Sequence, residues 1–488
     1  MRTLKHKNVE YSEVSFSELE KTMRIDAEFY DATHIKVDKE LGKFATDKLT
    51  QVCHVSDGNH FKISERFSDE GIPYYRGQDT TGCYFIEQSE PVRIDKETFN
   101  RSFMKRSHLK KGDILLSIVG TIGSVSLVTT NQEATCSCKL AILRCSQVLP
   151  EFLFSYLISH YGNSQIQKFA RGALQTGFIL ADSPQIKVPQ VSKGFQSAIA
   201  SLVTQSYIQK QKSLDVYKEA EELLYKELNL DTWKPKKSKF KSYNVQFEIE
   251  DNHSIIQLST MLKGDRLDAE YWDAACLELL DRLSKFDTRK LGSEIIIKNG
   301  FPFQSKQFIE VGEGEPFIRI RDCKPHFIQT ADLTKLDNDY VKKLKVTKAN
   351  TGDIVIGMDG LKWFYGSLVV EPVYVNQRVC HIQIKPKSQF TPEYILLVIN
   401  SKIGQMQLLR QMTIADTVGH IKNTDVAGLI IPASKNVKAI TKKVKSVQLA
   451  EQQSKSLIDV AKKAVEIFVE QDEKEALKYI KNEQNKVK

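Results

Sequence analysis

The chain has 488 residues, of which 41% are hydrophobic and 27% charged, a composition typical of globular proteins and unlike that of disordered or fibrous chains. No apolar run approaches the roughly 18 residues of a membrane span, and the first residues do not form a signal peptide, so the expected location is the cytoplasm. A formal charge of +9 permits a polyanionic partner without requiring one.

The first half predicts a mixed α/β globule over residues 1–195. Strand-like apolar runs at 114–119 and 126–128 are separated by glycine-rich turns, a pattern typical of a curved antiparallel or mixed sheet. Pro150 precedes an apolar stretch and suits the first turn of a helix that continues toward Ser159.

A long helix is predicted over 196–232, because no proline or internal glycine interrupts the segment from Phe195 to Leu230. Apolar residues recur at coiled-coil spacing at Leu214, Tyr217, Leu224 and Leu228. Glu221 interrupts this seam. A lysine-rich stretch over 233–250 then predicts a basic linker.

The second half predicts a second mixed α/β globule over 251–437, followed by a helix over 438–484. Its strand-like runs lie at 353–357, 367–370 and 379–384. The spacing of the first long helix returns at Leu457, Val460, Ala464 and Ile467.

A tandem duplication relates the two halves. The octapeptide at 24–31 returns at 266–273, an offset of 242 (266 − 24). Further matches in the same order pair 73–76 with 316–319, 112–115 with 352–355, 150–159 with 392–401, and 212–214 with 455–457. The repeat is longer than the roughly 20–50 residues of a solenoid unit, which indicates duplication of a whole domain. The segments between the matches differ, so a shared frame is expected to carry two different surfaces.

The expected fold is therefore of mixed α+β class, with two tandemly repeated α/β domains, each followed by a long helix. Either helix alone would expose an apolar stripe, so the two are expected to pair as an antiparallel coiled coil. A helix of about 35 residues is on the order of 50 Å long, so such a pair would hold the globules apart. The alternative is that each helix folds back on its own globule.

These features together resemble the specificity subunits of type I restriction-modification systems. The resemblance rests on the duplicated Arg-(Ile/Leu)-Asp-Ala-Glu-aromatic openings, on the run from Gly112 to Gly123, and on the Ile-Lys-Val-Pro and Leu-Ile-Ile-Pro segments that end at Pro189 and Pro432. It covers nearly the whole chain. The second half departs from the Gly-Thr-x-Gly pattern at 360–366.

The resemblance implies a non-catalytic DNA reader whose two target recognition domains bind a bipartite sequence. The implied partners are double-stranded DNA, two DNA methyltransferase (modification) subunits and a restriction/translocase subunit. No cofactor is expected in this chain, whereas S-adenosylmethionine, ATP and magnesium are expected in the partner subunits. Phosphate-loop, amino-methyltransferase and hydrolase motifs are absent from the sequence, in keeping with this role.

Candidate DNA contacts are mainly guanidinium, amide and hydroxyl side chains in loops near glycine, since such groups read base edges and bind phosphates. In the first domain they are Tyr75, Arg76, Gln78, Thr121, Lys139, Arg171, Gln175 and Thr176. In the second they are Arg319, Arg321, Lys362, Trp363, Arg378, Thr417 and His420.

Each candidate also has a purely structural interpretation. Arg76 and Arg319 occupy matched frame positions and could form ion pairs with carboxylates. The threonines could shape turns, and Trp363 could belong to the core. Arg24 with Asp26, and Arg266 with Asp268, are interpreted as structural pairs.

Other functions remain open at this point. The eight cysteines show no zinc spacing, so no metal site is predicted and reduced thiols are expected. One alternative is the specificity subunit of a related type IIB or phage-exclusion methylation system. Another is a helical adaptor that binds no DNA.

Overall fold

The computed structural model describes residues 2–6, 9–17, 19, 24–172, 176–234, 266, 268, 270–309, 313–328, 330, 333–360, 363–415 and 418–487. The chain divides into two compact units, which we call unit 1 (Met1–Lys210 with Gln452–Lys488) and unit 2 (Gln211–Glu451). Both contain helices and sheets, which confirms the mixed α/β class. From residue 235 on, the predicted basic linker lies outside the described residues, and the predicted domain boundaries stay predictions.

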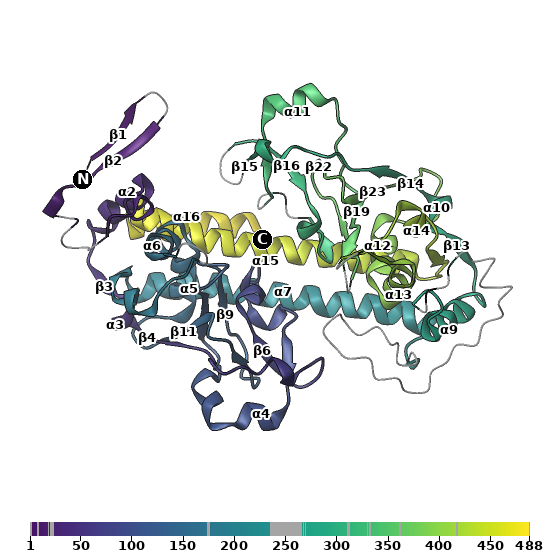
Figure 1. Cartoon of the computed structure of the whole chain (residues 1–488), viewed down its shortest axis with the longest axis horizontal. Helices are drawn as coiled ribbons and strands as arrows, with labels where there is room; N and C mark the ends of the chain where they lie inside the picture. The colour runs from purple at the N-terminus through teal and green to yellow at the C-terminus, as the bar shows by residue number, and fades with distance from the viewer. Residues whose placement is uncertain are drawn as a thin grey trace. The chain divides into compact units, whose positions relative to one another are not determined.

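Unit 1 is built around an antiparallel sheet in the order β4-β11-β8-β9 (Figure 1). These strands are β4 (Cys53–Asp57), β11 (Leu140–Cys145), β8 (Asp113–Ser117) and β9 (Val125–Leu127). All of β8 is buried, because alternate side chains enter opposite cores: Ile114 and Leu116 join the larger cluster and Leu115 a smaller one. The predicted strand segments are therefore present.

Unit 1 also contains a second sheet, two strand pairs and several short helices. A second sheet has the order β10-β6-β7-β5 and contains β10 (Thr135–Cys136), β6 (Ile72–Tyr75), β7 (Val92–Ile94) and β5 (Phe67–Ser68). Two antiparallel pairs join β3 (Thr46–Lys48) to β12 (Lys187–Pro189) and β1 (Arg2–His6) to β2 (Val9–Glu13). The helices are α2 (Ala32–Leu41), α3 (Leu49–Val52), α4 (Lys96–Asn100), α5 (Pro150–Ile158) and α6 (His160–Phe169).

Local sequence explains where these helices begin. The Asp31 side chain accepts a hydrogen bond from the Thr33 amide at 2.8 Å and caps α2. Pro150 occupies the first turn of α5, as predicted. The Ser159 side chain caps α6, and a Cβ on Gly162 would lie 2.1 Å from the Tyr156 carbonyl oxygen, so only glycine allows α6 to pack this closely on α5.

Unit 2 repeats this plan around a sheet in the order β14-β23-β19-β21-β17. These strands are β14 (Ile295–Asn299), β23 (Val379–Ile384), β19 (Ile354–Gly357), β21 (Gly366–Leu368) and β17 (His326–Phe327). In β19, as in β8, Ile354 and Ile356 enter the larger core of the unit and Val355 enters a smaller one. The predicted strands of the second half are therefore present as well.

The other elements of unit 2 complete two smaller sheets, one antiparallel strand pair and the helices. The sheets contain β15 (Phe308–Ile309), β18 (Lys335–Leu336), β16 (Glu315–Ile318) and β22 (Tyr374–Val375), and β20 (Asp359–Gly360), β25 (Val418–His420) and β24 (Thr413–Ala415). The pair joins β13 (Thr288–Lys290) to β26 (Ile430–Pro432). The helices are α9 (Ala274–Leu283), α10 (Leu291–Glu294), α11 (Asn338–Leu344), α12 (Pro392–Asn400), α13 (Lys402–Gln411) and α14 (Asn423–Ala427).

Matched glycines begin the central strand of each unit. Gly112 before β8 has φ +88°, and Gly352 before β19 has φ +90°, a left-handed conformation that favours glycine. Their amides donate equivalent hydrogen bonds, to Val128 O at 2.8 Å and to Val369 O at 2.9 Å. The duplicated Gly-Asp-Ile sequence is thus explained by the same turn before the central strand of each unit.

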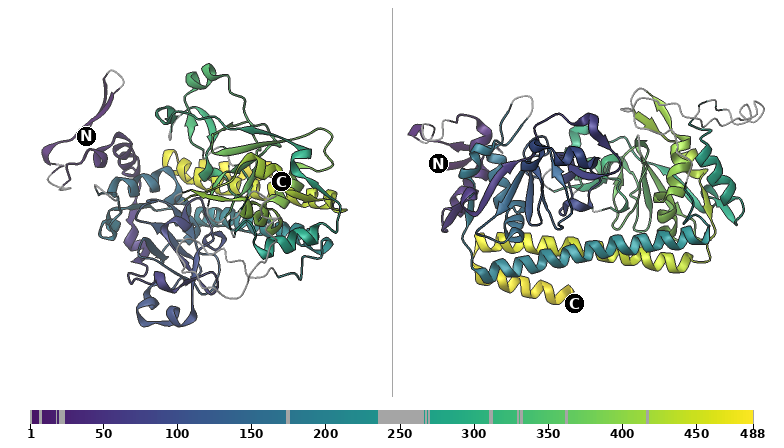
Figure 2. Two further views of the ribbon diagram at one scale, coloured as in Figure 1. Left: turned by 45° about the vertical axis from the view of Figure 1, so that its right-hand side comes forward. Right: turned by 90° about the horizontal axis from the view of Figure 1, so that it is seen from below.

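The two long helices are α7 (Lys193–Glu227) and α15 (Val437–Glu470). In unit 1, the first part of α7 lies beside the second part of α15 (Figure 2), and Ser206 donates to Ser454 O at 2.7 Å. In unit 2, the second part of α7 contacts the first part of α15, where Lys443 pairs with Glu219 at 2.5 Å. Each part also joins the core cluster of its own unit.

The structure corrects the predicted helix boundaries at three places. α7 begins earlier than 196 and ends at Glu227, where Asn229 adopts a left-handed φ of 53° and closes the helix. The single helix predicted over 438–484 is two helices, α15 and α16 (Glu473–Val487). The break has a local cause, because the Asp472 side chain accepts a hydrogen bond from the Glu475 amide at 2.9 Å and caps a new helix.

Candidate nucleic-acid interface

In unit 1, the loops that carry the predicted DNA contacts converge on the segment that follows β8. The Ile118 amide donates to Lys139 O at 3.0 Å, and the Phe178 amide donates to Ile118 O at 2.8 Å. The Thr121 hydroxyl donates to Gly77 O at 3.0 Å. Segments far apart in the sequence therefore form one surface at the end of the central strand, which we call loop cluster 1 (residues 76–80, 118–123, 138–139 and 171–172 with 176–178).

The exposed residues of loop cluster 1 other than glycine are Gln78, Lys139, Arg171 and Thr176. Arg171 forms an ion pair with Asp182, while its backbone exchanges two hydrogen bonds with Gly177 at 2.9 Å each. These side chains present an amide, two cations and a hydroxyl to solvent. Gln175 lies outside the described residues.

Tyr75 is a correction to the predicted contacts. Its side chain is only 3% exposed and belongs to the smaller core cluster with Leu115. Burial raises the pKa of its phenol well above the ordinary value. Tyr75 therefore packs the sheet and does not reach a DNA surface in this structure.

Arg76 and Arg319, at matched positions, make hydrogen bonds within the frame of their own units, and Arg76 also lies beside a carboxylate. The Arg76 amide donates to the Asp79 carboxylate at 2.7 Å, and the Arg319 amide donates to Asp322 at 2.8 Å. The Arg76 Nε lies 3.6 Å from the Asp79 carboxylate, and Arg319 Nη2 donates to the Thr334 hydroxyl. Each arginine begins a short 3-10 helix, η3 (Gly77–Thr80) in unit 1 and η8 (Ile320–Asp322) in unit 2.

The Thr121 hydroxyl is used within the loop. It hydrogen-bonds the Ser117 hydroxyl at 2.8 Å as well as Gly77 O. Its turn-shaping interpretation is therefore supported.

Unit 2 assembles its loops with the same backbone connections. The Met358 amide donates to Arg378 O at 3.0 Å, and the Ile421 amide donates to Met358 O at 3.0 Å. Met358 thus occupies the place that Ile118 has in unit 1. We call this surface loop cluster 2 (residues 319–323, 358–360 with 363–364, 376–378 and 418–421).

The side chains of loop cluster 2 differ from those of loop cluster 1. Asp359 accepts a hydrogen bond from the His420 ring at 2.6 Å and lies 3.5 Å from the Arg378 guanidinium. Arg378 is otherwise exposed, and His420 is half-buried. The carboxylate therefore orients a cation and an imidazole at the surface. Arg321 is exposed and donates to the Thr334 hydroxyl at 3.0 Å.

Trp363 is an exposed aromatic residue and not part of the core. Its side chain is 47% exposed, and its ring stacks on Tyr365 with centroids 5.9 Å apart. Nearby Ile414 and Val418, on the β24–β25 hairpin, are also exposed. An apolar surface beside cations suits contact with a thymine methyl group in the major groove. Lys362 and Thr417 lie outside the described residues.

Sequence reasoning missed a polar cluster beside loop cluster 1. Asp57, at the end of β4, pairs with His60 at 2.6 Å and with Arg106. Asn59 forms an isolated bridge to Ser137, which brings this cluster to the 138–139 turn. The only signal of this polar cluster in the sequence was the position of Asp57 at the end of a strand. Ile414 and Val418 were also missed, because exposed apolar residues have no local signature.

The duplicated Arg-x-Asp motifs are structural, as interpreted. The Arg24 guanidinium forms a two-pronged pair with Asp26, and Arg266 forms the same pair with Asp268. These hydrogen bonds hold the pKa values of both carboxyls below their ordinary range. Arg266 also donates to Gln411 O at 3.2 Å, at the base of the β24–β25 hairpin.

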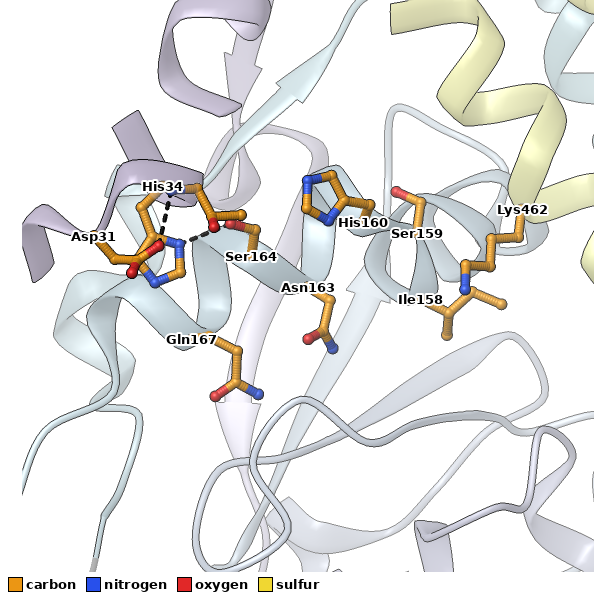
Figure 3. Close-up of a pocket in the computed structure, with 10 residues that line it drawn as sticks. Asp31, His34, Ile158, Ser159, His160, Asn163, Ser164, Gln167 and Lys462 are labelled. Atoms are coloured by element: carbon orange, nitrogen blue, oxygen red, sulfur yellow. Dashed lines mark hydrogen bonds between the residues drawn. The ribbon is translucent and has the colours of Figure 1, made fainter. Parts of the chain in front are cut away.

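Within the described part of the chain, no cluster of histidine, cysteine and carboxylate side chains could hold a metal ion. Cysteines 53, 136, 276 and 380 are buried, and burial raises the thiol pKa of Cys53 to about 12. The same described residues contain no helix with the length and apolarity to cross a bilayer. A pocket of about 430 Å³ in unit 1 is lined mainly by residues of α2 and α6, with Ile158 of α5 and Lys462 of α15 (Figure 3).

Proteins similar to this chain include specificity subunits of type I restriction-modification systems. No family model matches the chain. Over 137 residues the chain is 26% identical to the specificity subunit of the type I restriction enzyme EcoBI of Escherichia coli, a match that covers 28% of this chain and 26% of that protein. The matched segment thus spans about a quarter of the relative's length.

Two solved structures are also similar to the chain. The S subunit of a type I restriction-modification system from M. genitalium is 14% identical with a TM-score of 0.35, covering 90% of this chain and 96% of that one. The HsdS subunit from Thermoanaerobacter tengcongensis is 14% identical with a TM-score of 0.27, covering 91% and 95%. The resemblance to type I restriction-modification specificity subunits, indicated by the duplicated motifs, is confirmed by the similarity to the EcoBI subunit.

Proposed function

We propose that this chain is the DNA-specificity subunit of a type I restriction-modification complex. The observation that carries the proposal is the equivalence of Ile118 and Met358. Each donates to the backbone of one loop and accepts from the backbone of another, yet the side chains around them differ between the units. Two readers built on one frame with different surfaces would recognise two different half-sites.

The chemistry of both loop clusters suits duplex DNA. Lys139 and Arg171 in unit 1, and Arg321 and Arg378 in unit 2, place cations at the surface, where they would neutralise phosphates. Gln78 and the forked guanidinium groups can make the paired hydrogen bonds that distinguish adenine and guanine in the major groove.

The long helices would set the distance between the half-sites. We propose that α7 and α15 form an antiparallel coiled coil, supported by the contacts of Ser206 with Ser454 in unit 1 and of Glu219 with Lys443 in unit 2. The sums of the paired residue numbers, 660 (206 + 454) and 662 (219 + 443), are nearly constant, as antiparallel pairing requires. Half-sites on one face of B-DNA lie about 34 Å apart for each helical turn.

The partners follow from the same role. We propose that the chain is not itself catalytic and docks two methyltransferase subunits and one restriction/translocase subunit. These partners would supply S-adenosylmethionine, ATP and magnesium, and the complex would act in the cytoplasm.

The test is single-molecule sequencing of DNA methylation in the wild-type strain and in a strain that lacks this gene. The proposal expects loss of a bipartite methylated motif with a fixed gap. If the methylated motifs are unchanged, binding of the purified chain to genomic fragments separates a silent system from a helical adaptor. Absence of both effects would overturn the proposal.

A further inference from the structure

An amide side chain occupies the same place in α6 and α13. Asn163 is the fourth residue of α6 and Gln405 the fourth of α13, and their separation of 242 (405 − 163) equals that of the duplicated octapeptides. In both helices a glycine precedes the amide, and the serine that caps the helix lies three residues before that glycine. The two amides are therefore equivalent positions of the duplicated frame.

Both amides bind the backbone of the loop that follows the central strand. Asn163 Nδ2 donates to Gly123 O at 2.9 Å. Gln405 Oε1 accepts from the Phe364 amide at 2.9 Å, and its Nε2 donates to Phe364 O at 3.0 Å. Gly123 and Phe364 are themselves 241 positions apart (364 − 123), so one contact has been kept in two loops of different sequence.

In unit 1 this contact fixes a left-handed turn. Gly123 has φ +84°, and a Cβ there would lie 2.7 Å from Asn163 Nδ2. Gln167, one helical turn further along α6, donates to Ile122 O at 2.8 Å. Figure 3 shows both amide side chains extending to the same side of α6. The loop is thus held by side chains that do not belong to it.

We propose that Asn163 and Gln405 are positioning residues for sequence recognition, each holding the reading loop of its own unit. This inference rests on the proposed function. Because each amide bonds to backbone atoms, the loop side chains can differ without loss of the anchor. A shared anchor therefore explains how Gly120–Ser124 and Gly360–Phe364 diverged on a common frame.

The test replaces each amide by a side chain of similar shape that cannot hydrogen-bond, Asn163→Leu and Gln405→Met. Each variant gene replaces the wild-type gene in the host, and methylated motifs are determined by single-molecule sequencing. Duplexes with the wild-type motif, and with single mismatches in either half-site, are then used to measure binding by the variant complexes. Asn163→Gln, which keeps the amide, is the conservative control.

Asn163→Leu is expected to relax the first half-site only, with discrimination against mismatches falling about 5- to 100-fold, while the second half-site and the gap stay unchanged. Gln405→Met is expected to do the reverse, so each variant controls for the other. Asn163→Gln is expected to retain most discrimination. Where buried Gln405 cannot be replaced without unfolding, Asn163 at its half-buried position still decides the question.

The inference is overturned if Asn163→Leu leaves mismatch discrimination unchanged, or if it weakens both half-sites equally. Equal weakening would show that the amide contributes only to stability. These outcomes differ from failure of the proposed function, in which the wild-type protein itself shows no bipartite motif and binds no DNA.

Discussion

The pair formed by Asp113 and Arg144 offers a sharp test of how unit 1 is held together. Asp113 opens β8, the strand that leads to loop cluster 1, and its side chain is only 1% exposed. Its carboxylate accepts from Arg144 Nε at 2.8 Å, from Arg144 Nη2 at 2.7 Å and from the Lys110 amide at 2.8 Å. Asp113→Ala removes all of these bonds and leaves the guanidinium without a carboxylate, with only the 3.4 Å bond to His108 O remaining.

Loss of one partner of a fully buried pair costs about 3–5 kcal/mol. Because the Arg144 side chain is 39% exposed and can be hydrated, we expect about 2–4 kcal/mol here. For a unit of roughly 250 residues this lowers the midpoint of thermal unfolding by about 4–8 °C. The effect should be confined to the calorimetric transition of unit 1.

A double-mutant cycle with Arg144→Ala provides the control. The two single variants and the double variant should be non-additive by about 1–3 kcal/mol, since both remove the same interaction. Denaturation of the purified chain, followed by calorimetry and by circular dichroism, measures each value. An Asp113→Ala variant within about 0.5 kcal/mol of wild type, or additive single variants, would refute this reasoning.

Further predictions concern recognition and pH. Trp363→Ala should weaken binding to the second half-site by about 1–3 kcal/mol and leave binding to the first half-site unaffected. Binding is measured on duplexes in which one half-site is scrambled. Ile208→Ala on α7 is the control for loss of an exposed apolar side chain. Arg171→Ala should weaken binding to all duplexes alike and reduce the slope of log K against log salt by about one, and an unchanged slope would contradict a phosphate contact. The pKa of Asp268 is lowered in the folded state, so its contribution to stability is present above about pH 4 and is lost as pH falls through the lowered value. Asp268→Asn should therefore reduce the fall in the free energy of unfolding of unit 2 at acid pH. An unchanged fall would show that the pair of Asp268 with Arg266 does not cause it.

Much of the local structure was predictable because its causes are local. The strand runs at 114–119 and 379–384 contain β-branched and apolar residues that fit a buried sheet, and strands lie there. Pro150 begins a helix, as predicted. The duplication was visible because the frame residues of both units, such as Gly112 and Gly352, make the same turn and so keep the same type.

The chemical role of individual residues was less predictable, because burial depends on distant parts of the chain. Tyr75 was expected at the surface and is buried, whereas Trp363 could have been buried and is exposed. Arg76 was a possible base reader, yet Asp79 engages it inside the frame. For Tyr75 and Trp363 no spacing rule separates the two cases, since exposure of each side chain depends on elements remote in sequence.

The sequence by itself predicted two copies of one domain plan, with long helices after each, because repeated motifs and helical spacing are properties of order along the chain. Only the tertiary structure decided which loops meet. Lys139 and Phe178 meet Ile118 through backbone hydrogen bonds, and Gly77 meets the same loop through the Thr121 hydroxyl. Backbone groups are the same in every residue, so contacts of this kind leave no trace in the sequence.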